Sequence, residues 1–473
     1  MKLRAAVFTA LTALTALASA SSTSTALAAP AADPFSAYLN SAPVADAAIS
    51  EANSGSGTSA VTMRRFTFPS RGGANSVYAI YAYPQAAGSY PGILMLHGGG
   101  SNAEDLAGLV QGYAQRGYAA LSVDLPGICG TGNHSSGPWE ARPVGEGPRF
   151  DVATGTQNST LADAETAGLE AFNWLRAQAK VNPAAMGITG FSWGGYSTTF
   201  LSGLLGDKVK AAYAVFGCGF YEKGSFWKSL IAALPTTDRD TWLATFDAGR
   251  RAPGMKAAYF LEGESNDTYF WPEAVSATLA AVPGTKNHTW GPNLNHKQLP
   301  AGPAMQRLWF DHHLKGSAGA FATATLVRLE DQADGTRKAR IETAWQEGPA
   351  APAGVTIDSV RLWFSPVGGA WTDRVWTAVA AKPGDSAWTA VIPASQAGLT
   401  LDVYAVSTDS RSVATASAMR NAGPVGPVTI MRGAAPSVKT SPSYGGGGRR
   451  ILYPSRPDRS GRGRDALGEI WHQ

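Results

Sequence analysis

Short apolar runs alternate with amphipathic segments over roughly the first two-thirds of the chain. The runs are continuously apolar, as in strands buried on both faces, and the segments between them repeat with helical spacing. This alternation predicts an α/β domain at residues 66–318, in which helices cover both faces of a mostly parallel sheet. The expected strands lie at residues 77–83, 92–96, 119–123, 186–189, 211–216, 256–261 and 285–290, and the expected helices at 103–115, 159–178, 195–205, 270–281 and 303–314.

The pattern changes after residue 318. Short apolar runs at 323–329, 339–344, 360–364, 387–392 and 401–406 are separated by Gly, Pro, Asp and Ser, and no helical pattern lies between them. This spacing predicts a small antiparallel β-sandwich at residues 319–431. Its tryptophans could stack on sugar rings, but large aromatic side chains more often fill a sandwich core or its rim, which is what we expect here. They are Trp345, Trp363, Trp371, Trp376 and Trp388.

The two ends of the chain read as segments outside the folded body. Lys2 and Arg4 precede an apolar, charge-free run at 5–20, and small residues follow at 18–20 and 26–28. This is the pattern of a secretory signal peptide at residues 1–29, cut after Ala28 or Ala29. Residues 30–65 read as a lead-in segment and residues 432–473 as a disordered basic tail. No later run of 18 apolar residues suggests a membrane span, so we expect a secreted or periplasmic protein.

The net charge of +4 comes from these two ends. The signal segment holds two basic residues and the tail eight basic and three acidic, which leaves 29 basic and 32 acidic residues in the body. A body with a net charge of −3 gives no reason to expect nucleic acid or an anionic membrane as a partner. The oligomeric state stays open. Cys129 and Cys218 could form one disulfide, which also stays open, and two cysteines alone make no metal site.

Two long connections interrupt the alternation, at residues 126–158 and 219–253. Loops of this length within a domain are usually functional or disordered. Both follow strands of the predicted sheet and carry several aromatic residues. We expect the first to form a wall of a substrate pocket and the second to form a cap on the same side.

The most informative motif is Gly190-Phe191-Ser192-Trp193-Gly194. In a chain with 54 glycines the pentapeptide alone is a weak signal. Here it stands between an apolar run and a helical segment, the context of a nucleophile elbow, in which a strained turn exposes the serine. Ser192 is therefore the candidate nucleophile.

An acid and a base should follow Ser192 in that order along the chain. Glu262, Glu264 and Asp267 come after the strand at 256–261, and we favour Asp267 because it lies at the tip of a polar turn. The alternative is an Asp that only bonds its own backbone in that turn.

His296 is the candidate base, since it lies in a loop between the last strand and the last helix. His288 falls within a strand, where a packed or surface side chain is expected. His312 and His313 fall on the last helix and read as solvated.

The strand at 92–96 ends in His97-Gly98-Gly99-Gly100. Backbone N–H groups of Gly98 or Gly99, together with that of Trp193, would converge on the oxyanion of an acyl-transfer intermediate. An ordinary glycine loop is the alternative reading. His97 itself is expected to be structural.

These motifs resemble the α/β-hydrolase superfamily over about residues 66–316. Within it, residues 190–195, 265–267, 292–296 and 308–316 are similar to the secreted branch shared by dienelactone hydrolases, acetyl xylan esterases and prolyl-oligopeptidase-like proteins. Prolyl oligopeptidases usually carry a β-propeller before the hydrolase domain, and residues 30–65 are too few for one.

The resemblance implies an exported serine esterase without a cofactor or metal. Its expected substrate is a small-molecule or glycan ester, plausibly an acetyl ester. A serine peptidase with the same machinery and a non-catalytic binding protein on a hydrolase scaffold are the alternatives.

Overall fold

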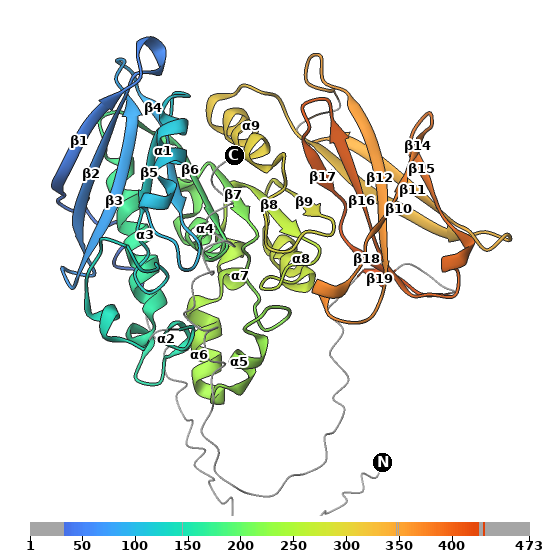
Figure 1. Cartoon of the computed structure of the whole chain (residues 1–473), viewed down its shortest axis with the longest axis horizontal. Coiled ribbons are helices and arrows are strands. Elements are labelled where there is room, and N and C mark those ends of the chain that lie inside the picture. The colour runs from blue at the N-terminus through green and yellow to red at the C-terminus, as the bar shows by residue number, and fades with distance from the viewer. Residues whose placement is uncertain (1–32, 144, 347, 349, 425–428, 431–473) are drawn as a thin grey trace, which may run out of the picture. The chain divides into compact units, whose positions relative to one another are not determined.

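The computed structural model describes residues 33–143, 145–346, 348, 350–424 and 429–430 (Figure 1). The predicted signal peptide, and the predicted basic tail at 432–473, lie outside these residues. Described residues from Pro34 onward form one unit. No helix within the described part of the chain is both long and apolar enough to cross a membrane.

A nine-stranded sheet underlies the first two-thirds of the chain, in the order β1-β2-β3-β5-β4-β6-β7-β8-β9. Strands β4 to β9 run parallel, whereas β1, β2 and β3 join antiparallel, with β3 next to β5. The strands are β1 (Ala47–Ser54), β2 (Val61–Ser70), β3 (Asn75–Pro84), β4 (Tyr90–Leu96), β5 (Ala119–Val123), β6 (Val181–Phe191), β7 (Ala211–Val215), β8 (Ala258–Glu264) and β9 (Lys286–Gly291). The predicted fold class is confirmed.

The sheet starts earlier than the sequence pattern suggests. The expected lead-in at 30–65 contains all of β1 and the first half of β2, so it is part of the sheet. Strand β1 lies at the edge of the sheet, and each of its residues before Ser54 is exposed. It therefore contains no apolar run that would indicate a strand. In β2 the pattern is broken by Arg64 and Arg65, which pair with Asp46 and Glu104.

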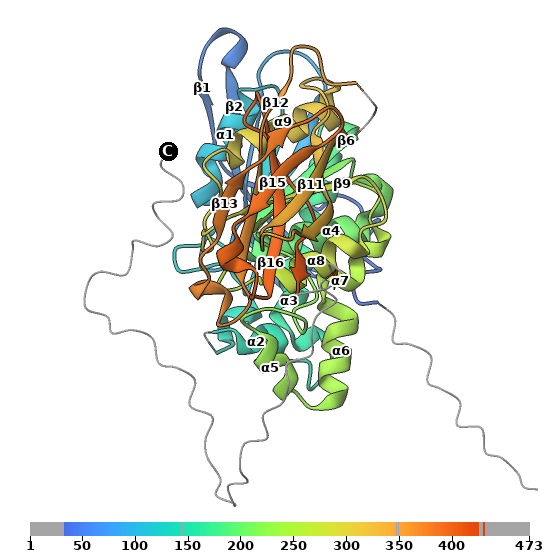
Figure 2. The same ribbon diagram turned by 90° about the vertical axis from the view of Figure 1, so that its right-hand side faces the viewer.

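Helices cover both faces of this sheet, as Figures 1 and 2 show. On one face, α3, α4 and α8 pack into an apolar cluster that includes Leu169, Phe200 and Val275. On the other face, α1 and α9 contribute Tyr113 and Trp309 to a second cluster. These helices are α1 (Ala107–Ala114), α3 (Thr160–Arg176), α4 (Trp193–Leu205), α8 (Pro272–Ala281) and α9 (Gly302–Lys315).

Four further helices lie in the described residues of the two long connections. They are α2 (Gly147–Phe150), α5 (Lys228–Ala233), α6 (Thr236–Phe246) and α7 (Ala248–Arg251). Helices α2, α5 and α6 gather beyond one end of the sheet, at the bottom of Figures 1 and 2.

Two antiparallel sheets follow α9 and pack as a sandwich (Figure 2). Leu326, Ile341, Leu362 and Val403 belong to its core. One sheet contains β10 (Ala322–Asp331), β11 (Arg337–Trp345), β15 (Trp388–Ile392) and β14 (Lys382–Pro383). The other contains β13 (Thr377–Ala380), β12 (Ile357–Pro366), β16 (Leu401–Asp409), β17 (Ala414–Ala416), β18 (Arg420–Ala422) and β19 (Thr429–Ile430).

Three of the five tryptophans, Trp363, Trp371 and Trp376, pack on a different apolar cluster from the one expected. Trp388 packs against the sandwich core. Trp371 and Trp376 are buried, but they belong to the apolar cluster under α3, α4 and α8. These side chains therefore join the sandwich to the nine-stranded sheet, and the sequence pattern does not specify which of the two surfaces they contact.

Cys129 and Cys218 are both free, so the possible disulfide is not formed. Their parent strands β5 and β7 are separated by β4 and β6. Three strand spacings amount to roughly 14 Å, about twice the Cα separation that a disulfide spans. Burial raises the pKa of Cys129 to about 12 and that of Cys218 well above its ordinary value.

A buried carboxyl makes stability depend on pH. Glu165 of α3 accepts a 2.6 Å hydrogen bond from Ser197 of α4, and burial raises its pKa from 4.5 to about 8. Between these values the unfolded state ionises while the folded state keeps its proton, so the free energy of unfolding falls as pH rises.

Glu165→Gln is expected to remove this part of the pH dependence. The variant should match the wild type in thermal unfolding near pH 4.5 and exceed it increasingly up to pH 8. An offset in melting temperature that does not change across this range would contradict the assignment.

Candidate active site

Ser192 lies in the sharp turn between β6 and α4. Its φ of 56° is positive, which non-glycine residues rarely adopt, and its ψ is −118°. The flanking glycines allow the turn to form. A Cβ on Gly190 would lie 2.4 Å from the carbonyl oxygen of Gly194, and a Cβ on Gly194 would lie 2.1 Å from that of Leu96. Only glycines fit these positions, so the strained elbow is built into the sequence.

The structure brings Ser192, His296 and Asp267 together in one row. Nε2 of His296 lies 3.0 Å from Oγ of Ser192. On the opposite side of the ring, Nδ1 lies 3.0 Å from Oδ2 and 3.1 Å from Oδ1 of Asp267. A carboxylate only accepts hydrogen bonds, so Nδ1 carries the proton and Nε2 is free to accept from the serine hydroxyl.

Aromatic rings hold the imidazole of His296 in this position. Ring centres of Phe216 and Tyr269 lie 4.4 Å and 4.7 Å from it, and Phe270 stacks on it at 6.0 Å. The His296 side chain is 14% exposed and that of Asp267 is fully buried. The hydrogen bond between them is therefore shielded from solvent, which strengthens it.

Asp267 also bonds the backbone of its own turn, which is the alternative role that the sequence suggests for it. Its Oδ1 accepts hydrogen bonds from the backbone N–H groups of Tyr269 and Phe270, at 2.6 Å and 3.1 Å. The loop of His296 is tied to this turn, because Oδ1 of Asn295 accepts from the N–H and the hydroxyl of Thr268. Asp267 thus fixes its own loop and orients the imidazole at the same time.

The other two acid candidates are engaged elsewhere. Glu262 accepts hydrogen bonds from the N–H of Leu299 and the hydroxyl of Tyr213, and burial raises its pKa to about 7. Glu264 is fully buried. Burial, with smaller contributions from Glu262 and Asp267, raises its pKa well above the usual value.

The other histidines near the end of the predicted α/β domain, His288, His312 and His313, are half-buried. His288 of β9 contacts the carbonyl oxygen of Ser417, and burial lowers its pKa to about 4. The prediction that His313 is solvated is wrong, because its ring lies 4.2 Å from that of Trp309 and burial lowers its pKa to about 3. His312, on the same helix, lies 4.6 Å from His313 between ring centres.

The backbone around Gly98 and Gly99 lies against the nucleophile. A Cβ on Gly98 would lie 3.3 Å from Cβ of Ser192, and a Cβ on Gly99 would lie 2.8 Å from the ring of Trp193. Trp193 is the first residue of α4, where backbone N–H groups lack an acceptor within the helix. The arrangement places candidate oxyanion donors on both sides of Ser192.

His97 organises the loop that carries these glycines. It is fully buried, its Nε2 accepts from the N–H of Leu125, and its Nδ1 donates to the carbonyl oxygen of Gly98. Burial, as the largest effect, lowers its pKa. A neutral imidazole that bonds backbone at both nitrogens has a structural role.

Sequence reasoning did not single out Arg149, a buried residue of α2. Its guanidinium lies 4.8 Å from the ring of Trp193, and Nη1 bonds Glu146 at 2.5 Å. Glu146 also accepts from the indole N–H of Trp227, at 3.1 Å. Arg149 thus links the connection at 126–158 to the connection at 219–253. No local pattern around an arginine in a long loop indicates such a contact.

Aromatic side chains line the space beside His296. Phe226 and Tyr269 are 54% and 37% exposed, and their ring centres lie 5.5 Å apart. The N–H of Phe226 donates to the carbonyl oxygen of Tyr269, which attaches the predicted cap to the acid loop. Trp227 stacks on Tyr269 and also contacts Trp193. Apolar rings are therefore presented to solvent directly next to the triad.

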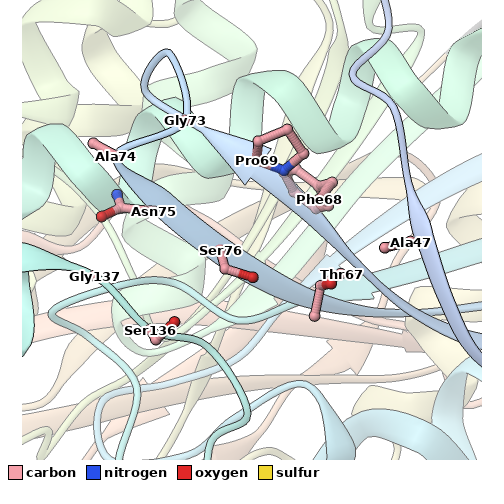
Figure 3. A pocket seen from close by; sticks show the side chains of 10 residues that line it. All are labelled: Ala47, Thr67, Phe68, Pro69, Gly73, Ala74, Asn75, Ser76, Ser136 and Gly137. Carbon is pink, nitrogen blue, oxygen red and sulfur yellow. The ribbon is translucent and has the colours of Figure 1, made fainter.

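Figure 3 shows a hollow at the turn between β2 and β3. Phe68, Asn75 and Ser136 are among its lining residues. Strand β3 is three positions away from β6 in the sheet, so this hollow is separate from the site at Ser192.

Comparison with protein families gives a match to the middle of the sheet, including the elbow. A model of the dienelactone hydrolase family matches residues 77–236, which span β3 to the start of α6. A search of curated protein sequences gave no significant match.

Solved structures with a related fold include two acetyl xylan esterases. The enzyme from Thermoanaerobacterium sp. JW/SL YS485 is 15% identical, with 59% of this chain and 92% of that chain covered and a TM-score of 0.48. The enzyme from Paenibacillus sp. R4 is 18% identical at the same coverage, with a TM-score of 0.47. A puromycin-hydrolysing peptidase from Mycobacterium tuberculosis is 16% identical, covers 55% of this chain and 47% of that chain, and has a TM-score of 0.35.

The strand order, the strained elbow at the carboxyl end of β6 and the family match over residues 77–236 fit a member of the α/β-hydrolase superfamily, and the match supports an enzyme of the hydrolase class.

Proposed function

We propose that the protein is an exported serine esterase that cleaves carboxylic esters through an acyl-enzyme. The observation that carries the proposal is the continuous row of contacts from Ser192 through His296 to Asp267. A serine hydroxyl is a poor nucleophile at neutral pH unless an oriented imidazole takes its proton during attack.

In the first half of the reaction, Oγ of Ser192 attacks the ester carbonyl carbon while Nε2 of His296 takes the hydroxyl proton. The carbonyl oxygen becomes an oxyanion and accepts hydrogen bonds from the N–H of Trp193 and that of Gly98 or Gly99. The carbon–oxygen bond to the alcohol then breaks, and His296 gives its proton to the departing alkoxide. Asp267 stabilises the imidazolium while it carries the extra proton.

In the second half, water takes the place of the alcohol. His296 accepts a proton from the water, and the resulting hydroxide attacks the acyl carbon. The bond to Oγ breaks, Ser192 recovers its proton from His296, and the acid leaves. The site returns to its starting state without a cofactor.

The proposed substrate is an acyl ester, with acetyl esters of carbohydrate as the expected class. The sequence resemblance suggests the acetyl group, and the apparent signal peptide supports export to where such glycans occur. The exposed rings of Phe226 and Tyr269 offer an apolar surface for the alcohol part, next to His296.

A substrate panel tests this proposal. Purified protein should hydrolyse p-nitrophenyl acetate and acetylated xylo-oligosaccharides with a higher kcat/KM than peptide p-nitroanilides. Faster cleavage of the peptides would assign the same triad to a peptidase. Binding of acetylated glycans without turnover of any substrate would favour the non-catalytic alternative.

A further inference from the structure

One segment of the sandwich, residues 367–376 between β12 and β13, contacts the loops that carry Asp267 and His296, and it is here termed the docking loop. It contains a short 3-10 helix at Trp371–Asp373. The docking loop reaches both of the loops that carry the acid and the base of the proposed triad.

The first contact lies directly before the acid. The side-chain amide of Asn266 donates a 2.6 Å hydrogen bond to the carbonyl oxygen of Arg374. Asn266 is 5% exposed, and its own Oδ1 accepts from the hydroxyl of Ser265 at 2.7 Å. Its amide is thus held at both ends, immediately next to Asp267.

The second contact lies three residues before the base. Asn293 forms a pair of hydrogen bonds with the backbone of Trp376, since its Oδ1 accepts from the N–H at 2.7 Å and its Nδ2 donates to the carbonyl oxygen at 2.9 Å. Its own N–H donates to the hydroxyl of Ser265. Asn293 therefore connects the base loop to both the docking loop and the acid loop.

The base loop needs such support because its backbone is unfavourable. Asn293 and His296 have φ values of 61° and 45°. Positive φ at non-glycine residues persists only where the surroundings fix it, and such positions cluster at functional sites. The bonds from the docking loop are part of what fixes it.

The docking loop is itself rigid. The guanidinium of Arg374 pairs with Asp402 of β16, and both side chains are buried. It also lies 3.6 Å from the ring of Trp371. Trp376 packs on Tyr404, with ring centres 4.8 Å apart. The backbone groups that bond Asn266 and Asn293 are thereby anchored in the sandwich.

We infer that the docking loop of the sandwich positions Asp267 and His296, with Asn266 and Asn293 as the positioning residues. The sandwich is then part of what makes the hydrolase site active. This inference rests on the proposed esterase function.

A matched control lies at the other end of β9. There Asn287 donates a 2.7 Å hydrogen bond to the carbonyl oxygen of Ala322 in β10 and also contacts Gln346. Asn287→Ala removes an asparagine bond between the same two parts of the chain, but on a segment that does not carry the acid or the base.

The test compares Asn293→Gly, Asn266→Ala and their combination with Asn287→Ala. Glycine tolerates the positive φ of Asn293, and Asn293 is solvent-exposed, so the first variant loses the two bonds without adding strain or a cavity. In p-nitrophenyl acetate hydrolysis, the combined variant should lose kcat by on the order of 100-fold with KM nearly unchanged. Rates are expressed per active site titrated with a fluorophosphonate, so that misfolded protein does not count.

Asn287→Ala should keep the wild-type kcat even if its melting temperature falls. A wild-type kcat per titrated site in the combined variant would overturn the inference, and so would an equal loss in Asn287→Ala. Failure of the proposed function would show itself differently, as absence of turnover and of titratable sites in the wild type.

Hydrogen exchange tests the same inference without relying on activity. In the combined variant, amides at residues 264–270 and 292–297 should exchange faster than in the wild type and in Asn287→Ala, since the loops lose their anchor. Unchanged exchange in both segments would overturn the inference.

Discussion

Replacing Ser192 with alanine is expected to abolish ester hydrolysis, with a loss of kcat on the order of 10⁶-fold, the size found when a triad nucleophile is removed. Without Oγ no acyl-enzyme forms, and the oriented imidazole has nothing to activate. His296→Ala should cost about as much. The double variant should lose no more than either single variant, because the two groups act as one unit. Steady-state rates with p-nitrophenyl acetate measure all three.

Ser202→Ala is the matched control, since Ser202 is a buried serine of α4, the helix that Ser192 precedes. It should retain wild-type turnover. Substantial activity in Ser192→Ala, or losses in the double variant that equal the product of the single losses, would contradict the assignment.

Asp267→Asn is expected to lower kcat by about 10⁴-fold while the loop keeps its conformation. The amide oxygen would stay on the N–H groups of Tyr269 and Phe270, which Asp267 now binds. The NH₂ group would then face Nδ1 of His296 and favour the tautomer with the proton on Nε2. In that tautomer Nε2 no longer accepts the proton of Ser192.

Asp163→Asn serves as its control. Asp163 is a buried carboxylate bonded to Arg71 and Asn75, and its contacts do not involve His296. It should change kcat little, even though it weakens an ion pair. An Asp267→Asn enzyme with near wild-type kcat would mean that this carboxylate does not orient the base.

The sequence predicted the parallel part of the sheet because its strands are apolar on both faces. All five residues of β7 are buried, for example, so the strand reads as one apolar run. Strand β1 carried no such signal, because an edge strand with an exposed surface looks like a loop. The predicted boundaries of the two domains, residues 66–318 for the α/β domain and 319–431 for the sandwich, stay a prediction.

The residues of the proposed triad could be chosen from chain order together with position in the predicted turns. In this fold the nucleophile, acid and base each follow a particular strand, so position along the sequence stands in for position in space. That logic separated Asp267 from Glu262 and Glu264 on turn position. The structure supplies what order cannot, namely that the imidazole of His296 lies between Ser192 and Asp267.

The support around the site could not be predicted in this way. Asn266 bonds a backbone oxygen 108 residues later in the chain, and Asn293 bonds one 83 residues later. Side-chain contacts with distant backbone leave no periodic or local trace in a sequence. Trp371 and Trp376 show the same limit, since their burial was foreseen but not the surface on which they pack.

The central claim is that an acyl group passes through Oγ of Ser192. Rapid acid quenching of the wild type during its first turnover of p-nitrophenyl acetate, followed by peptide mass spectrometry, tests it most directly. The account predicts one acetyl group, on the peptide that contains Ser192, with a burst of p-nitrophenol of matching size. A burst with the acetyl group on any other residue would contradict it.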